Sequence, residues 1–226
     1  MMQKRSKTAG TPAWLAQLKT KGGAILPFEI PGIHTPLLHL KRKNRRIKGS
    51  FIGHAELMSS QGEPRQYAGL SDAQKEAVLR LEHKRVLLDS VPWEGRTARD
   101  NWAYRCNFLF YLYLVEPDHA VGLRYGDAPR DNALGLLCER SLCLVTREHV
   151  EVYGELEAYQ RLMQHYRKWS ALGKPDISAY PVEWASGKAT KKRSRANVLG
   201  WIQRPKECLC VYYPKKQAAH SGRKRA

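Results

Sequence analysis

The sequence predicts an α+β fold: a mixed or antiparallel sheet with an aromatic-rich central strand, two main amphipathic helices, and basic flexible termini. Apolar residues recur every three or four positions over 71–89 and again over 146–172, and this spacing predicts the two helices. The central strand is predicted because large apolar residues alternate along 101–115. The order of elements is irregular, which favours α+β over a repeated strand–helix–strand unit.

Length and composition bound the domain organisation. The chain has 226 residues, of which 42% are hydrophobic and 27% are charged, and this composition is typical of folded proteins rather than disordered chains. We expect a flexible basic arm over 1–24, a single α+β domain over 25–213 and a basic tail over 214–226.

Prolines shape the first part of this domain. Pro27, Pro31 and Pro36 each lack a backbone donor and bias the preceding residue toward extended structure, so we expect extended chain or an edge strand over 24–40. The basic run that follows leads into a strand expected over 50–58.

The first predicted helix covers 71–89. Ser71 is the expected N-cap, with Gln74 at the reciprocal position of a capping box. An irregular loop then separates this helix from the strand predicted over 101–115, which ends in eight consecutive apolar residues.

Shorter strands and a second helix complete the prediction. A strand is expected over 121–125, and 134–137 can pair with 142–145, with a helix as the alternative there. Thr146 is the expected N-cap of the second helix, and Gly173 follows its end, where glycine is favoured. The remaining predicted strands cover 180–184, 197–202 and 208–213.

Positive charge is confined to the two ends of the chain. The net charge is +18, to which residues 1–55 contribute +10, residues 186–226 contribute +11 and the centre contributes −3. Clustering of like charges costs self-repulsion, which a polyanion relieves, and release of its counterions favours binding. A solvated loop that only aids solubility is the alternative. The predicted phosphate contacts are Lys41, Arg42, Lys43, Arg45, Arg46 and Lys48 in a first cluster and Lys188, Lys191, Lys192, Arg193 and Arg195 in a second.

Aromatic residues near these clusters are candidates for base stacking. Trp201 follows the second cluster and has Arg204 close behind it, so a ring and a charge could meet the same strand of nucleic acid. The aromatic residues of 101–115 are weaker candidates, because eight consecutive apolar residues are typical of a core.

One short segment carries residues suited to acid–base chemistry. Glu116, Asp118 and His119 follow the predicted central strand and could hold Mg²⁺ or transfer protons on a phosphodiester, although a solvated turn explains the same residues. No glycine-rich phosphate loop or nucleophile elbow is present. The catalytic residues, if any, are therefore unknown, and the balance is against an enzyme.

The cysteines are expected to be reduced core residues of a cytoplasmic protein, because their number is odd and no signal peptide precedes them. Zinc binding is the alternative, but the spacings fit structural zinc knuckles poorly. The four candidate ligands are Cys138, Cys143, Cys208 and Cys210. The sequence implies no cofactor.

These observations predict a nucleic-acid-binding accessory protein that grips the sugar–phosphate backbone of DNA or RNA with little sequence readout. Two alternatives stay open: a nuclease or phosphotransferase acting on nucleic acid, and a non-enzymatic subunit or inhibitor that binds an acidic protein surface. A membrane partner is not expected, since the longest apolar run of eight residues is far shorter than the roughly 18–20 needed to span a bilayer.

Overall fold

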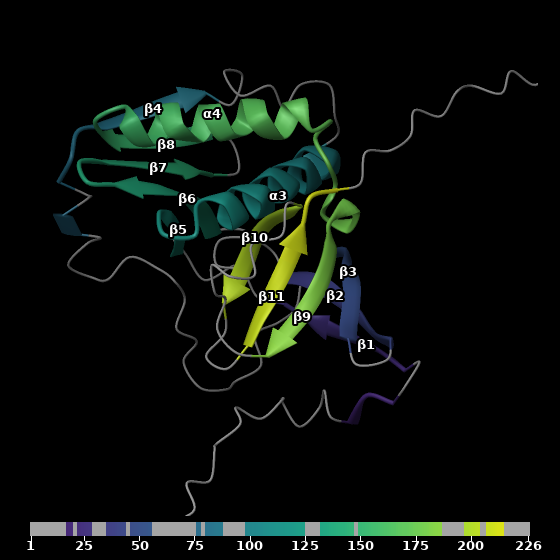
Figure 1. Ribbon diagram of the computed structural model, residues 1–226. Coiled ribbons are helices and arrows are strands. Elements are labelled where there is room, and N and C mark those ends of the chain that lie inside the picture. Colours follow the sequence, from purple (N-terminus) through teal and green to yellow (C-terminus); the bar gives the residue numbers. More distant parts are fainter. Residues whose placement is uncertain are drawn as a thin grey trace, which may run out of the picture.

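A computed structural model describes eleven segments of the chain, and its elements are named below as in Figure 1. Within these segments the structure contains two α-helices, one 3₁₀ turn, η3 (Ile177–Ala179), and eleven strands in two antiparallel sheets, which confirms the α+β class. The described residues are 17–19, 22–28, 35–43, 46–55, 76–77, 80–87, 98–124, 132–146, 149–186, 197–203 and 207–214.

The first sheet has six strands and combines the two ends of the described chain. The extended structure predicted over 24–40 is found in its edge strand and the neighbouring strand, but the neighbour continues through residues 41–43 of the basic run. The strand predicted over 50–58 begins four residues earlier, at Arg46, and residues 56–58 lie outside the described residues. The strands predicted over 180–184, 197–202 and 208–213 are confirmed. All neighbouring pairs are antiparallel. The order of strands is β1 (Gly23–Pro27), β2 (Thr35–Lys43), β3 (Arg46–Ala55), β9 (Pro181–Ser186), β11 (Glu207–Tyr212) and β10 (Val198–Gln203).

The second sheet has five strands and is built from the middle of the chain. The predicted strand over 121–125 and the predicted pair around residues 139–140 are confirmed, the latter as a tight hairpin. The order of strands is β4 (His83–Leu87), β8 (His149–Gly154), β7 (Ser141–Val145), β6 (Asn132–Cys138) and β5 (Ala120–Arg124).

The aromatic-rich segment is a helix, α3 (Ala98–Val115), so the central strand predicted over 101–115 is wrong. Residues 104–112 are buried on every side of this helix, and a helix with no polar face loses the 3.6-residue periodicity that would reveal it. Length argues for the helix, because fifteen extended residues would reach about 50 Å, far beyond an ordinary strand.

The second predicted helix begins later than expected. Its first part forms β8, and α4 covers only Glu157–Ala171. Thr146 stabilises the β7–β8 turn instead of capping a helix: its hydroxyl donates to the backbone oxygen of His149 at 2.7 Å and accepts from the backbone nitrogen of His149 at 3.2 Å. Gly154 ends β8 with φ 73°, a left-handed conformation that favours glycine.

The first predicted helix is also partly wrong. Residues 83–87 form β4, an edge strand that pairs with β8, whereas residues 76–77 are helical. Residues 71–75, which include the expected capping box, lie outside the described residues.

One hydrophobic core connects both sheets through the helices. In Figure 1, α3 lies between the six-stranded sheet below it and α4 above it. Phe110 of α3 packs against Phe51 of β3 with ring centroids 4.8 Å apart, and Phe108 packs against Tyr166 of α4 at 5.2 Å. Gly200 of β10 meets the backbone of α3 so closely that any side chain would collide with it. Among the described helices, none is long and apolar enough to cross a membrane.

Candidate functional site

The hairpin of β2 and β3 carries the described part of the first basic cluster. Lys41 stands opposite Lys48, and Lys43 stands opposite Arg46. Residues directly opposite each other in a sheet point to the same side, so all four side chains share one side of the hairpin. We call this set the cationic face: Lys41, Lys43, Arg46 and Lys48, each of them exposed.

Arg42 points to the other side of the hairpin. It alternates with Lys41 and Lys43 and stands opposite Ile47, which is 8% exposed. That side continues into the fully buried Leu40, and Arg42 itself is half-buried. The structure therefore separates Arg42 from the other described bases of the cluster.

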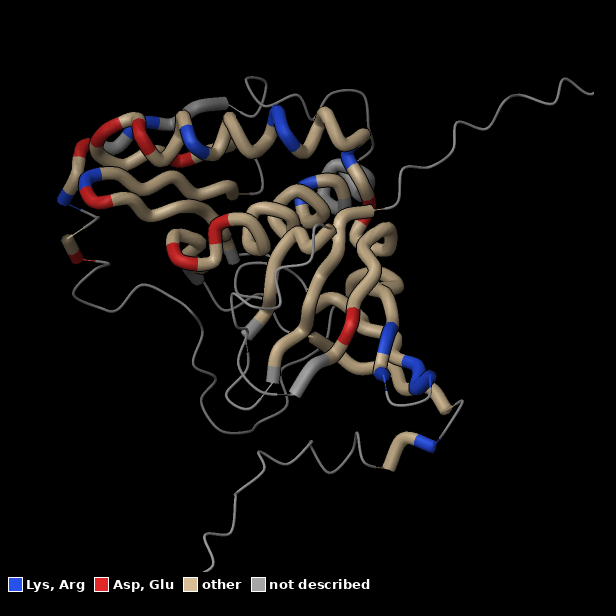
Figure 2. Tube along the Cα trace, in the orientation of Figure 1, with Lys and Arg blue, Asp and Glu red and all other residues tan. Residues whose placement is uncertain are grey.

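The cationic face places like charges directly against each other. Like-charged pairs across a sheet destabilise it, each by some 0.2–1 kcal/mol. Among the described residues, only Glu183 of β9 is an acid standing opposite one of these bases, Lys48. Figure 2 shows a group of basic positions at the β2–β3 end of the six-stranded sheet with few acidic positions beside it, whereas basic and acidic positions are mixed around α4 and the five-stranded sheet.

One row of opposed residues crosses the whole six-stranded sheet. From β1 to β10 it consists of Gly23, Lys41, Lys48, Glu183, Cys210 and Trp201. Trp201, which is partly exposed, therefore shares its side of the sheet with the cationic face, and α3 packs on the opposite side at Gly200. Three strand spacings separate β3 from β10, a distance of about 14 Å.

The rest of the predicted phosphate contacts cannot be placed against this surface, because they lie outside the described residues. They are Arg45 of the first cluster, Arg204, and all of the second cluster, namely Lys188, Lys191, Lys192, Arg193 and Arg195.

Four aromatic residues of α3 belong to the core and offer no stacking surface: Tyr104, Phe108, Phe110 and Tyr111 are at most 6% exposed. The hydroxyls of Tyr104 and Tyr166 are hydrogen-bonded at 3.0 Å, which joins α3 to α4. Tyr113 packs against the core but is partly exposed. Among the described stacking candidates predicted from the sequence, Trp201 and Tyr113 therefore remain partly exposed.

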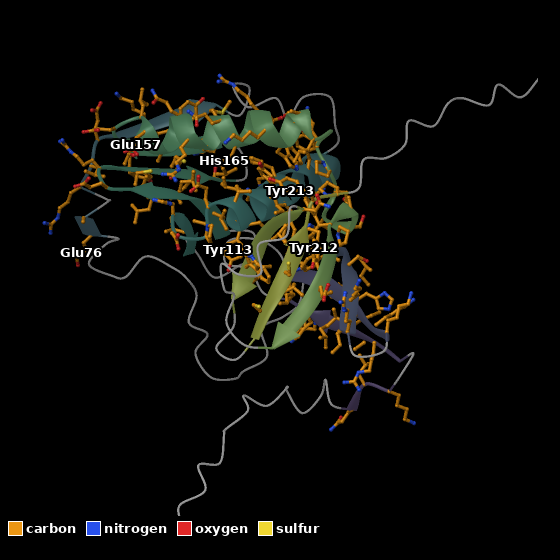
Figure 3. All side chains as sticks on the ribbon, viewed as in Figure 1. Glu76, Tyr113, Glu157, His165, Tyr212 and Tyr213 are labelled. Carbon is orange, nitrogen blue, oxygen red and sulfur yellow. The ribbon has the colours of Figure 1, made fainter. Side chains whose placement is uncertain are left out.

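A second constellation forms around a buried carboxylate at the end of α3. Glu116 is 7% exposed, and Arg161 of α4 donates to both of its oxygens, Nε to Oε1 and Nη2 to Oε2, each at 2.8 Å. Nε2 of His165 lies 2.5 Å from Oε1, and Nδ1 of His119 lies 3.2 Å from Oε2. Figure 3 labels His165 on α4, the helix that also supplies Arg161.

Sequence reasoning identified Glu116 and His119 but missed Arg161 and His165. A signal was present, because His165 interrupts the otherwise apolar buried stripe of α4 formed by residues such as Leu162 and Trp169. A polar residue within such a stripe needs a buried partner, and Arg161 lies four positions earlier, on the adjacent turn of the same helix.

The pKa values of this cluster favour an ionised Glu116 beside a neutral His165. Burial raises the pKa of Glu116, but the hydrogen bonds from Arg161 and His165 outweigh it and hold the pKa below its usual value. Burial lowers the pKa of His165, and Lys168 and Arg161 add to this effect, against the opposing pull of Glu116. Since Arg161 already neutralises the carboxylate, we assign Nε2–H of a neutral His165 as donor to Glu116.

These shifts predict that the protein loses stability in mild acid. Glu116 and His165 both have lower pKa values in the folded protein than in the unfolded chain. Their contribution to the free energy of unfolding is therefore complete above the unfolded pKa and is lost as the pH falls. The loss begins near pH 6.5 with His165 and continues below about pH 4.5 with Glu116. Urea unfolding at pH 7.5, 6.0 and 5.0 should show a falling midpoint.

The matched variant for this test is His165→Gln, which keeps a side-chain N–H for Glu116 but does not titrate. Between pH 7.5 and 5.0 its midpoint should fall less than that of the unaltered protein. An equal fall in both proteins would remove His165 as the source of the effect. Arg161, Lys168 and the ring of Tyr111 also face His165.

His119 and Arg161 also line a pocket of about 1020 Å³ that lies beside the β6–β7 turn and the start of α4. The His119 side chain is 38% exposed. Asp118 is exposed in the turn after α3 and is not part of the lining. Of the three acid–base candidates, the structure therefore brings Glu116 and His119 together and leaves Asp118 apart.

The four candidate zinc ligands are divided between the two sheets, and all four are buried and outside any disulfide bond. Cys138 and Cys143 lie on β6 and β7, whereas Cys208 and Cys210 both lie on β11. Burial raises the pKa of Cys143 to about 12, and its thiol donates to the backbone oxygen of Ala158 at 3.3 Å. Within the described segments, no group of three or more His, Cys, Asp or Glu residues could hold a metal ion.

Comparisons with known proteins add little to this geometry. No protein-family model and no curated protein matches the chain. A solved structure of a protein-L-isoaspartate O-methyltransferase aligns with it at 12% identity and a TM-score of 0.35. The alignment covers 75% of this chain and 45% of the methyltransferase chain. At this TM-score the likeness carries no inference about fold or activity.

Proposed function

We propose that this protein binds nucleic acid through the sugar–phosphate backbone, with the cationic face as the surface that contacts phosphates. The observation that carries the proposal is the pairing of four bases in two like-charged cross-strand pairs on one side of one hairpin. Such pairs work against folding, and a bound polyanion removes the repulsion that they cause.

The spacing of the cationic face supports a polymeric anion. Lys41 and Lys43 are two residues apart on β2, or about 7 Å, and the paired strands are about 5 Å apart. Four positive charges within this area require several negative charges to neutralise them. A phosphate chain supplies these from one molecule and gains free energy from released counterions.

Little sequence readout is expected from this surface. The described bases project from strands of a broad sheet, and contacts of Lys and Arg with phosphates set the position of nucleic acid without reading its bases. The charge of both chain ends, +10 over residues 1–55 and +11 over residues 186–226, would add non-specific attraction.

A salt series tests the proposal. Binding of a labelled 20-nucleotide strand, measured by fluorescence anisotropy between 50 and 400 mM KCl, should weaken steeply with salt. Four phosphates on the cationic face alone predict a slope of log K against log salt near −2.8 for single strands, at about 0.7 per phosphate. No binding at 50 mM KCl would overturn the proposal. In that case the alternative of an acidic protein partner would take its place.

The same experiment addresses the enzymatic alternative. If the bound strand is cleaved, and the cleavage is absent in His119→Ala with its fold intact, the protein is a nuclease and binding is only one part of its function. We expect the strand to be recovered whole, since Arg161 and His165 already engage the carboxylate of Glu116 in a buried ion cluster.

A further inference from the structure

The cationic face continues along the hairpin of β2 and β3, in the direction away from its turn. Two residues beyond the pair of Lys41 and Lys48, His39 stands opposite Ser50. We infer that the bound phosphate chain lies along the hairpin, and that His39 is a further phosphate contact which acts only when its imidazole is protonated. The inference rests on the proposed function, because it adds a pH-dependent residue to the same surface.

His39 and Ser50 lie on the same side of the sheet as the cationic face. Side chains two residues apart on a strand point to the same side, so both residues share the side of the bases next to them. Both are partly exposed, whereas Leu40, which points to the opposite side, is fully buried. The two pairs of bases and this third pair therefore form one track, about 14 Å long at ordinary strand rise.

The surface around the third pair is open. Ile25 of β1 stands opposite His39 and is 59% exposed. Pro181 of β9 stands opposite Ser50 and is partly exposed. Neither neighbour carries a charge that would repel phosphate. The ladder between β2 and β3 shifts register just past Leu38, so this pair is the last that continues the cationic face.

The imidazole of His39 points toward the cationic face. Its Nε2 lies 3.3 Å from the point where a Cβ on Gly23 would sit, and Cγ of Lys41 lies 3.7 Å from the same point. Gly23 stands opposite Lys41 in the sheet, and because it has no side chain, the ring can occupy this space. The imidazole and the ammonium of Lys41 can therefore contact the same phosphate chain. Ser50 can add a hydroxyl donor, another group that binds phosphate oxygens.

The charge of this imidazole is coupled to binding. Among the described residues, the ionisable neighbours on its side of the sheet are Lys41 on β2, Lys48 on β3 and, beyond Lys48, Glu183 on β9, whereas β1 has no ionisable side chain. Phosphates bound beside the ring favour its charged form. Binding should therefore take up a proton, so the affinity should rise as the pH falls through the range 5 to 8 in which histidines change charge.

The test measures binding of the labelled 20-nucleotide strand by anisotropy at pH 7.5 and at pH 6.0, each over a salt series. At 0.1 M salt the unaltered protein should bind roughly 5-fold more tightly at pH 6.0, and its slope of log K against log salt should steepen by about 0.7, the value for one added phosphate contact. His39→Gln should show neither change. His39→Lys, which is charged at both pH values, should bind tightly at both and lose the pH response. Circular dichroism at pH 6.0 checks that each variant stays folded.

His119→Gln provides the matched control. The side chain of His119 is 38% exposed, but it lines the pocket beside the β6–β7 turn and is not part of the six-stranded sheet. The variant removes one imidazole away from the cationic face, so the response to pH should remain. If His119→Gln loses as much of the response as His39→Gln, protonation acts through net charge, and the role of His39 is overturned.

The outcomes separate this inference from the proposed function. Absence of binding at both pH values overturns both. Binding that does not tighten at pH 6.0, or that tightens equally in His39→Gln, overturns the role of His39 and leaves backbone binding by the four bases in place. A response that is present in the unaltered protein and in His119→Gln, and absent in His39→Gln and His39→Lys, supports the inference.

Discussion

Neutralising the cationic face should abolish nucleic-acid binding and at the same time make the protein more stable. The variant replaces Lys41, Lys43, Arg46 and Lys48 with glutamine. Loss of four phosphate contacts predicts a several-hundred-fold weaker affinity for a single strand at 0.1 M salt, with a salt slope smaller by about 2.8. Removing two like-charged cross-strand pairs should raise the free energy of unfolding by roughly 0.5–2 kcal/mol.

The opposite signs of the two effects make this experiment decisive. A surface kept only for solubility has no reason to retain paired like charges that destabilise its own sheet, whereas a binding surface does. The control replaces four exposed bases elsewhere with glutamine: Arg140, Arg167, Lys168 and Lys174. It has the same net charge but keeps the cationic face, so anisotropy should show only the small loss due to weaker long-range attraction. Equal losses in both variants would show that net charge, and not this surface, binds the ligand.

The sequence contains enough information to predict which bases of the run 41–48 share the cationic face. The sequence reveals the basic run 41–48, but treating it as a connection between strands hides its sidedness. Once the run is recognised as two strands joined at residues 44–45, alternation alone assigns Lys41 and Lys43 to one side and Arg42 to the other. Alternation cannot predict the row of opposed residues that joins the cationic face to Trp201. That row depends on the pairing of β3 with β9, which lies more than 130 residues later in the chain.

The errors in the helices have a related cause. Segment 101–115 is apolar on nearly every side, so local periodicity does not distinguish helix from strand there, and its state is decided by burial between the six-stranded sheet and α4. Residues 149–154 are different, because the sequence His-Val-Glu-Val-Tyr-Gly alternates and so indicates a strand. Val152 also fits the helical spacing that continues through Leu156 and Tyr159, and this longer pattern concealed the strand, which is held between β4 and β7.

The cluster around the buried carboxylate of Glu116 could be predicted only in part, because some of its residues are close in sequence and others are distant. Glu116 and His119 are close in sequence and could be identified together, as the turn after an apolar segment. Arg161, which supplies two hydrogen bonds to Glu116, is 45 residues away and joins it only because α4 packs beside the end of α3. The sequence could therefore suggest an acid–base site, but only the fold shows that the carboxylate is neutralised within the protein.

Glu116→Gln should destabilise the protein by about 3 kcal/mol, the scale of breaking a buried ion pair by removing one partner. Glutamine fits the space, but it leaves the guanidinium of Arg161 without its counter-charge and offers only one acceptor oxygen to the three donors that now share two. For a chain of 226 residues this corresponds to a fall in Tm of roughly 6–12 °C. Calorimetry at pH 7.5 measures it.

Two control variants test whether the loss of stability comes from the buried ion pair. Asp118→Asn changes an exposed acid two residues away and should shift stability by less than about 0.5 kcal/mol. The double variant Glu116→Leu with Arg161→Met replaces the ion pair with apolar side chains and should recover most of the loss, because apolar packing can substitute for a buried pair. If Glu116→Gln is as stable as Asp118→Asn, the cluster does not stabilise the fold. A chemical role for the carboxylate beside the pocket would then be the better explanation for burying it.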